Sequence, residues 1–458
     1  MPSILFSDFR GGLDKRRIPS VSDANKLTIL KNAYVTNGYT LKKRPGLRLA
    51  YELVAGTHGL VSAGGKLHTF SEGVVSHGLS EVENHQAIHP SALAVTGSSY
   101  GENYNGYLYA AVQYSDGSTL HHYFDGSATT RITDVNCPHS PQVAKNGSKM
   151  FAVGTETVRF CATNAARNWT LASDAGFLPV GVQASGDSTP TALGQFESFL
   201  AVFFEDAIQT WQVGADPSTH AIQKTAYLGT RYPFAHGNMG SDVFFLSQVG
   251  FRSVSTANQI GTLQDLDVGS PIDTLMQDEM RSVISPKTVY WRGGGMLMSF
   301  IANRIYIYSI SRAAKVSAWA LWETDLTIDA AAEVDGVMYL RSGDLVYALD
   351  SYAYTDAGAK FEVHIELPYM DCKAPGVEKQ FVGVDLVMNG TARIAHRFNP
   401  KDTTQITSYL EAEGDTRSGG MMPVELVATN IAPVIKNLSD QDFELAAVSY
   451  HFNHLSIW

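Results

Sequence analysis

Histidine is the residue type of this sequence with the widest capacity for chemistry, because its imidazole ligates metals and transfers protons near neutral pH. The chain has 14 histidines. The closest pairs along the sequence are His121 with His122, His85 with His89, and His451 with His454. Adjacent strand residues point to opposite faces, so His121 and His122 are not expected to ligate one ion together. His85 and His89 could share a helical face, but no third ligand stands near them.

The cysteines and the short motifs predict neither a metal site nor a catalytic site. Cys137, Cys161 and Cys372 are odd in number and form no CxxC spacing, which predicts buried free thiols. Asp265-Leu266-Asp267 lacks the further oxygen ligands of a calcium loop. Gly293-Gly294-Gly295 has no following Lys, which favours a tight turn over a phosphate site. We therefore expect no enzyme, no cofactor and no metal.

One basic concentration stands out in an otherwise acidic chain. It consists of Lys42, Lys43, Arg44, Pro45 and Gly46. One interpretation is a solvated turn. The other is a docking or inter-subunit contact, in which these cations meet acidic groups of an assembled ring, and it makes these five residues the candidate interface.

The overall composition favours a protein that is covered by partners. Charged residues make up 17% of the chain, against roughly 25% in an average soluble domain. There are 40 Gly, 21 Tyr and 21 Phe residues. Interfaces are poor in charge and rich in aromatic residues, so we expect much of the surface to meet other subunits; a glycine-rich β protein without such partners is the alternative.

The net charge of −11 argues against a protein that grips nucleic acid through its phosphates. An acidic or neutral wall would instead let DNA slide through a channel without being held. No leader-like segment and no run approaching 18 apolar residues occurs, so we expect a soluble protein, made in the cytosol, with no membrane span.

Hairpins are the main structural pattern of the chain, because short β-branched and aromatic runs alternate with Asp-Gly, Gly-Gly and Asn-Gly turns. The predicted hairpins are 107–114 with 120–124, 149–153 with 157–161, 199–204 with 207–213, 243–246 with 251–255, 296–301 with 304–310, and 337–340 with 345–349. They recur about every 40 to 55 residues, which is typical of propeller blades. We expect about five or six blades between residues 50 and 355; a double β-sandwich is the competing arrangement.

One segment departs from the β pattern. Ser270 and Pro271 precede apolar residues at helical spacing, which predicts a capped amphipathic helix from Ile272 to Val283. After Ala359 the expected strands become longer. They are 361–367, 381–388, 393–398, 424–429 and 443–452.

The predicted fold is therefore all-β: an irregular β-propeller with additional β-sandwich-like elements and one short amphipathic helix. Its expected parts are an N-terminal arm with the first strands (1–50), a propeller-like domain (51–357) and a C-terminal β domain or cap (358–458).

The order of several short motifs resembles that of the tail-hub or nozzle proteins of short-tailed bacteriophages. The resemblance begins with an Asn before a hydrophobic residue, then a Gly, then an Arg-Pro-Gly-like turn. The matching features are Asn32-Ala33-Tyr34-Val35, Gly38, Lys43-Arg44-Pro45-Gly46-Leu47, the hairpin from Phe199 to Trp211, the turn within Gly240 to Val254, the helix from Ile272, Ile305-Tyr306-Ile307-Tyr308, and Trp319 with Trp322. It covers most of residues 25 to 350.

The resemblance implies a virion protein of the tail, assembled in the host cytoplasm. Six copies would form a ring below the portal and the head-to-tail adaptor, and viral DNA would leave through its lumen without sequence recognition. The ring would also carry the tail needle, fibre or tailspike proteins. Two alternatives stay open: a carbohydrate-binding or other interaction propeller, and a propeller glycosidase with two carboxylates in one pocket.

Overall fold

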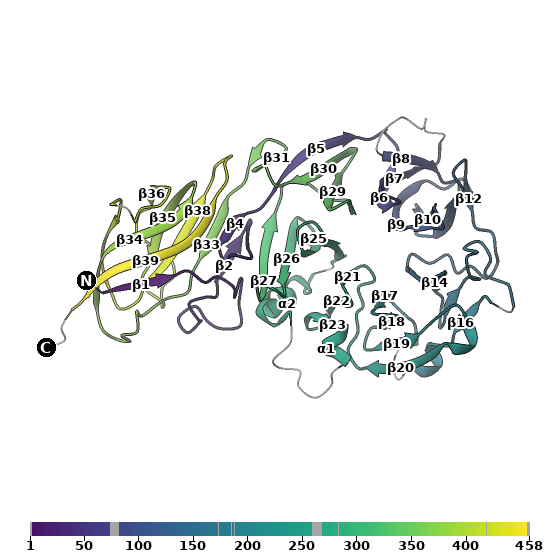
Figure 1. Cartoon of the computed structure of the whole chain (residues 1–458), viewed down its shortest axis with the longest axis horizontal. Helices are drawn as coiled ribbons and strands as arrows, with labels where there is room; N and C mark the ends of the chain where they lie inside the picture. Colours follow the sequence, from purple (N-terminus) through teal and green to yellow (C-terminus); the bar gives the residue numbers. More distant parts are fainter. Residues whose placement is uncertain are drawn as a thin grey trace.

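Short strands joined by tight turns make up almost all of the regular structure in the computed structural model of this chain (Figure 1). The structure describes residues 2–455 except 74–81, 173, 185, 187, 259–267, 283 and 418. Glycine supports the tightest turns. Gly117, for example, has φ 85° between β10 (Tyr107–Tyr114) and β11 (Thr119–Phe124), a conformation that strains other residues.

Seven propeller blades surround a common axis, and each contributes its first strand to the centre (Figure 1). The first strands are β6 (His58–Ala63), β9 (Val95–Tyr104), β13 (Val143–Asn146), β17 (Ala192–Phe196), β21 (His236–Met239), β24 (Lys287–Trp291) and β28 (Ala330–Val334). We number the blades one to seven in this order.

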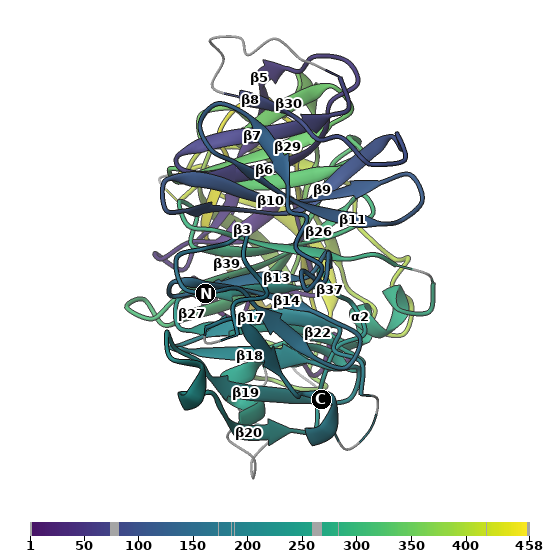
Figure 2. The ribbon, with the colours of Figure 1, turned by 90° about the vertical axis from the view of Figure 1, so that its right-hand side faces the viewer.

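The remaining strands of each blade follow outward from the axis, as Figure 2 shows for β17 to β20. In blade one these are β7 (Lys66–Ser71) and β8 (Val82–Gln86), and in blade two they are β10, β11 and β12 (Thr129–Arg131). Blade three continues with β14 (Lys149–Val153), β15 (Val158–Phe160) and β16 (Gly176–Leu178). Blade four continues with β18 (Phe199–Phe203), β19 (Ile208–Gln212) and β20 (Ala221–Ala226). Blade five continues with β22 (Asp242–Ser247) and β23 (Gly250–Ser253). Blade six continues with β25 (Met296–Ile301), β26 (Arg304–Ser311) and β27 (Val316–Glu323), and blade seven with β29 (Val337–Ser342) and β30 (Leu345–Asp350).

The ring is closed by strands that are distant in sequence. β28 of blade seven contacts β6 of blade one. The outer strand of blade seven is β5 (Gly46–Glu52), which precedes blade one in the chain and pairs antiparallel with β30. β5 also pairs with β31 (Thr355–Asp356), which continues into β32 (Ala359–Lys360). This closure excludes the double sandwich.

The all-β propeller prediction is confirmed, and each of the six predicted hairpins is present. The expectation of five or six blades is wrong, because the described residues form seven. The blade without a predicted hairpin is blade one, although its strands β6 and β7 form a hairpin across Gly64 and Gly65. Its other pair, β7 with β8, is parallel and therefore not a hairpin.

A two-sheet sandwich lies beside the propeller and holds the first and the last described strands, β1 and β39 (Figure 1). One sheet contains β1 (Ser3–Phe6), β3 (Ala33–Val35), β4 (Leu41–Lys43), β34 (Lys379–Asn389), β37 (Met422–Ala428) and β39 (Glu444–His454). The other contains β2 (Ile29–Lys31), β33 (Val363–Glu366), β35 (Thr391–Arg397), β36 (Leu410–Glu413) and β38 (Ala432–Asn437). The first 50 residues, which were expected to form a separate arm, are thus divided between the two parts. β1 to β4 lie in the sandwich with residues after 358, and β5 lies in the propeller.

One sheet runs from the propeller into the sandwich. β27, the outer strand of blade six, pairs in parallel with β2, which pairs in turn with β33. The resulting sheet has nine strands, and the sandwich shares one apolar core with blade six. Backbone hydrogen bonds and a common core therefore join the two parts.

The expected amphipathic helix is present but shorter than predicted. It comprises a 3₁₀ turn, η3 (Ser270–Ile272), and α2 (Asp273–Glu279), with Ile272 and Met276 buried. Val283 lies outside the described residues. The other helical pieces are α1 (Val254–Asn258), η1 (Gly181–Gln183) and η2 (Pro217–Thr219). Among the described residues, no helix has the length and hydrophobicity to cross a membrane.

Candidate functional site

The basic segment singled out in the sequence lies at the joint between the propeller and the sandwich. Lys43 and Arg44 are 1% and 2% exposed, and only Lys42 reaches the surface, near Asp442 and Glu444. The Lys43 ammonium donates to the side chain of Asn437 at 3.1 Å. The two buried cations are therefore neither a solvated turn nor an open docking surface. The inter-subunit role of the segment stays a prediction.

Arg44 is the centre of this joint. Its guanidinium donates to both oxygens of Asp356, at 2.8 and 2.5 Å, and to the Glu323 carbonyl at 2.9 Å. Its Nε donates to the side-chain oxygen of Asn32 at 3.1 Å, and the ring of Phe361 lies 3.7 Å from the guanidinium carbon. A single side chain thus contacts blade six, the segment after blade seven and the sandwich.

Asn32 completes the joint from the other side. It has a left-handed backbone, φ 55°, which asparagine adopts more readily than most residues. Its side-chain oxygen also accepts the backbone N–H of Glu323 at 2.8 Å, and its amide donates to the Glu362 carbonyl at 2.9 Å. Asn32 and Arg44, which carry the start of the phage tail resemblance, therefore form one hydrogen-bonded unit.

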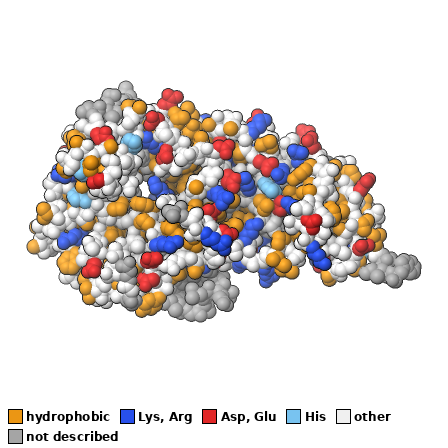
Figure 3. All heavy atoms as spheres, turned by 180° about the vertical axis from the view of Figure 1, so that it is seen from behind, with side chains coloured by type: hydrophobic (Ala, Val, Ile, Leu, Met, Phe, Trp, Pro, Cys, Tyr) orange, Lys and Arg blue, Asp and Glu red, His pale blue; other side chains and the backbone are white. Residues whose placement is uncertain are grey.

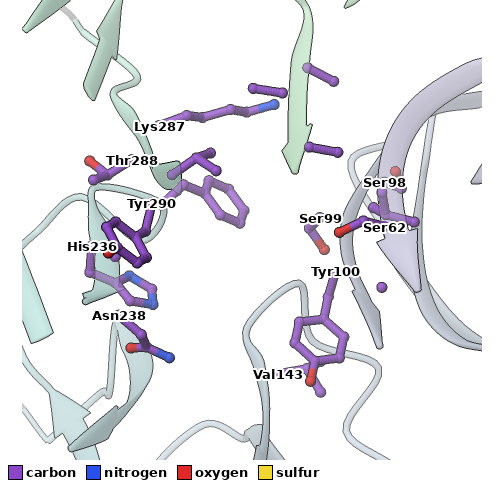
Figure 4. A pocket seen from close by; sticks show the side chains of 18 of the residues that line it. Ser62, Ser98, Ser99, Tyr100, Val143, His236, Asn238, Lys287, Thr288 and Tyr290 are labelled. Atoms are coloured by element: carbon purple, nitrogen blue, oxygen red, sulfur yellow. The ribbon is translucent and has the colours of Figure 1, made fainter. Parts of the chain in front are cut away.

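The centre of the propeller is a cavity of about 460 Å³ that is lined by residues from all seven first strands. Most polar side chains of its wall are uncharged, including Ser62, Ser98, Ser99, Asn238 and Thr288 (Figure 4). Tyr100 and Tyr290 lie on opposite sides of the space (Figure 4). The size is that of a small-ligand pocket.

The charged side chains that line this cavity are Glu102, Lys145, Lys287, Arg292, Asp329 and Glu333. The ammonium of Lys287 donates to the Asp329 carbonyl at 3.2 Å, and burial lowers the pKa of Lys287. Burial also lowers the pKa of His236 to about 4, so this imidazole is neutral at pH 7.

Three carboxylates line the cavity, and each has a structural partner. Asp329 accepts the backbone N–H of Gly343 at 2.7 Å, and Glu333 accepts that of Gly336 at 2.6 Å. Glu102 lies 3.6 Å from the Lys145 ammonium. Glycoside hydrolysis needs two carboxylates that face one sugar, whereas each of these three makes a contact within the scaffold.

Residues 97–101 have the spacing of a serine-hydrolase motif, Gly-x-Ser-x-Gly, around Ser99. The motif works only at a sharp turn between a strand and a helix. Here the five residues lie within the continuous strand β9, whose pairing with β10 includes Gly97 and Gly101. Ser99 is therefore a wall residue of the cavity and not a nucleophile elbow.

A second cavity, of about 480 Å³, adjoins the first where blades one and seven meet. It shares Ser98, Lys287 and Asp329 with the central cavity. The buried guanidinium of Arg341 lies in its wall and donates to the Gly59 carbonyl at 2.8 Å. This contact supports the closure of the ring.

No family model matches this chain. No curated protein matches it either. Among solved structures, BamB from Moraxella catarrhalis is similar with 12% identity and a TM-score of 0.37, covering 66% of this chain and 98% of BamB. A chain of the mitotic checkpoint complex has 13% identity and a TM-score of 0.33, covering 76% of this chain and 91% of its own. Likenesses this weak carry no argument about function, so the fold assignment here follows from strand topology.

Two groups of three potential metal ligands occur among the described residues. They are His121, Cys137 and His139, and His68, Glu83 and His85. His85 and His89, considered above for a shared helical face, do not share one, because His85 lies in the strand β8 and the His89 ring packs against Tyr114. Sequence reasoning missed both groups, since their members meet through the packing of different strands.

The cysteines follow the prediction. Cys137, Cys161 and Cys372 are buried free thiols. Burial raises the pKa of Cys137 to about 12, so its thiol stays protonated at neutral pH. The acidic segment 265–267, considered above as a calcium loop, lies outside the described residues.

Proposed function

We propose that this chain is a structural subunit of a short-tailed phage tail, which forms the nozzle or hub ring below the portal and adaptor. The observation that carries the proposal is the joint between Asn32 and Arg44. The segment that begins the resemblance to tail-hub proteins is also the segment that binds the propeller to the sandwich. A rigid subunit suits a ring that must keep its diameter.

In this proposal the DNA passes between subunits and not through a propeller. The central cavity of one propeller, about 460 Å³, has the size of a small-molecule pocket and leaves no room for a duplex. A head-to-tail interface that closes by rotation would enclose a wider lumen. The net charge of −11 would let DNA slide along that lumen without being held.

The outer edge of blade three is a candidate contact surface between copies. Val135, Leu171 and Phe177 are 93%, 46% and 55% exposed. The Asn136 side chain connects these positions. It hydrogen-bonds to Thr170, next to Leu171, and to Arg159, the strand partner of Phe177. One face of the molecule shows apolar side chains among interspersed acidic and basic ones (Figure 3). Such a surface fits the low proportion of charged residues.

A second candidate function is a small-ligand or carbohydrate-binding propeller. Tyr100 and Tyr290 on opposite walls of the central cavity, with hydroxyl and amide groups between them, favour this alternative (Figure 4). Aromatic faces stack on sugars, and the cavity volume suits one small ligand. The structural commitment of the three carboxylates argues against a glycosidase.

Native mass spectrometry of the full chain at several concentrations and salt levels tests the proposal, alone and with the adaptor ring. A hexamer, formed alone or on the adaptor, is the expected result. The Phe177→Asp variant should weaken assembly while folding normally, because the side chain is exposed. Tyr227→Asp, at another exposed aromatic position, is the control. A monomer that ignores the adaptor but binds glycans on an array would favour the second candidate.

A further inference from the structure

Blade one brings two imidazoles and a carboxylate together on one face. Glu83 and His85 are two residues apart on β8, so their side chains point to the same side. β7 pairs in parallel with β8 and places His68 opposite Glu83. The three side chains therefore form a triangle. His68 and His85 are 4% and 0% exposed, whereas Glu83 reaches solvent.

The distances in this triangle are close to those of a metal site. His68 Nδ1 lies 2.9 Å from His85 Nε2. Glu83 Oε2 lies 3.6 Å from the first nitrogen and 3.9 Å from the second. Ligands held 2.0–2.1 Å from a tetrahedral zinc ion are about 3.3 Å apart. Small rotations of the side chains would seat an ion between the three atoms.

Hydrogen bonds from surrounding groups orient the three potential ligand atoms toward one another. His68 Nε2 donates to the Ala63 carbonyl at 3.0 Å, which leaves Nδ1 unprotonated, with its lone pair directed into the triangle. His85 Nδ1 lies 3.2 Å from the Thr129 hydroxyl of blade two. The Lys66 ammonium binds Glu83 Oε1 and leaves Oε2 toward the imidazoles. Such outer contacts fix the tautomer and orientation of metal-binding histidines.

The other group of potential ligands is arranged differently. His121 Nε2 donates to the Ser140 carbonyl at 2.7 Å, and its Nδ1 is within 2.7 Å of the Tyr109 hydroxyl. The His139 Nδ1 accepts the backbone N–H of His121 at 3.2 Å. The two Nδ1 atoms thus already accept hydrogen bonds, and His121 Nε2 donates one. This group is therefore a hydrogen-bonded core cluster.

We propose that His68, Glu83 and His85 bind a divalent transition-metal ion such as Zn²⁺. Two imidazoles and a carboxylate form a donor set that suits this class of ion. Glu83 lies at the solvent side, so water would complete the coordination. The ion would link the middle and outer strands of blade one, and through Thr129 and the ring of Phe124 it would brace blade two. This inference does not depend on the tail function.

The competing arrangement has no metal. In it the Thr129 hydroxyl donates to His85 Nδ1, and His85 Nε2 donates to His68 Nδ1. The chain of hydrogen bonds is then complete without an ion. The two arrangements differ in whether the full chain binds one equivalent of Zn²⁺ at these three residues.

Calorimetric titration of the untagged, chelator-treated full chain with Zn²⁺ tests the proposal. We expect one equivalent to bind and the melting temperature to rise. Glu83→Gln keeps the size of a half-exposed side chain, should fold, and should weaken binding at least tenfold. Thr129→Val should weaken it about tenfold through the orientation of His85. His139→Ala, in the second group, is the control and should leave Zn²⁺ binding unchanged.

Binding of Co²⁺ supplies a readout that a general loss of stability would not change. The proposal predicts a visible d–d spectrum without the near-ultraviolet thiolate band that ligation by Cys137 would give. Absence of Zn²⁺ binding, full binding by Glu83→Gln, or a thiolate band removed by His139→Ala would overturn the proposal.

Discussion

At the scale of single residues, the joint at Arg44 makes the sharpest energetic prediction. Replacing Arg44 by Ala leaves the Asp356 carboxylate buried without its bidentate partner. Breaking a buried ion pair in this way costs about 3–5 kcal/mol. We expect the free energy of unfolding of Arg44→Ala to fall by that amount in urea denaturation.

The matched control is Arg48→Ala. Arg48 also pairs with an aspartate, Asp350, but its side chain is 62% exposed. Exposed pairs contribute about 0–1 kcal/mol, so this variant should be nearly as stable as the parent protein. Equal losses in the two variants would contradict the role given to the joint.

The buried histidines predict a loss of stability in acid. Burial lowers the pKa of His396 from 6.5 to about 4. The unfolded state therefore takes up this proton first as the pH falls. Stability is complete above pH 6.5 and declines between pH 6.5 and 4, by up to about 3 kcal/mol for this residue. His121, His122 and His236 have pKa values lowered in the same direction.

Urea unfolding of His396→Gln at pH 7, 6, 5 and 4.5 tests this linkage. The variant should lose less stability than the parent protein between pH 6.5 and 4, whatever its stability at pH 7. His454→Gln, at an exposed position of β39, should keep the parent slope. An unchanged slope in His396→Gln would contradict the prediction.

Residue types alone predicted some of these features. The lack of CxxC spacing correctly indicated free thiols, and the basic segment was recognised as unusual. Its burial was not predicted, because Asp356, Asn437 and Phe361 approach it only after the chain has folded. The triangle of His68, Glu83 and His85 was missed for the same reason. The alternation Glu83-x-His85 was a local signal, but the third member comes from another strand.

At the scale of elements, local turn signals located hairpins well and non-local pairings poorly. The hairpin across Asp116-Gly117 and five others were found because the turn residues and both strands lie within about 20 residues. Blade one was missed although Gly64 and Gly65 join its antiparallel strands β6 and β7; its outer pair, β7 and β8, is parallel. The outer strand of blade seven, β5, was also missed, since its partner β30 is nearly 300 residues away.

β5, which completes blade seven, packs so closely against β31 that we expect one added methyl group at Gly46 to destabilise the protein. A Cβ on Gly46 would lie 2.3 Å from the Thr355 carbonyl oxygen and 2.7 Å from its nitrogen. These are backbone atoms that can move only with β31. Gly46→Ala should therefore lower the free energy of unfolding by about 1–3 kcal/mol, measured in urea.

Gly38→Ala is the control for this substitution. The nearest atom to its new methyl group would be the Thr36 hydroxyl at 3.6 Å, an ordinary contact. Alanine lowers the conformational entropy of the unfolded chain relative to glycine, so Gly38→Ala should be as stable as the parent protein or slightly more stable. If both variants were equally stable, close packing of β5 against β31 would be refuted.

At the scale of the whole molecule, the sequence indicated a propeller but not how it is attached. The sandwich is built from both ends of the chain, for instance by pairing of β1 with β39. Strands so distant in sequence leave no local signal of their pairing. The nine-stranded sheet through β27, β2 and β33 then joins the sandwich to the propeller. This sheet and the shared apolar core join the two parts of the proposed ring subunit.

Cryo-electron microscopy of the assembled full chain, alone or on its adaptor ring, is the direct test of the proposed tail ring. We expect a closed ring of six copies with a lumen between subunits that is wide enough for a DNA duplex, while each propeller keeps its own narrow central cavity. Separate propellers at every concentration, with and without the adaptor, would contradict it, as would a ring without a lumen between its copies.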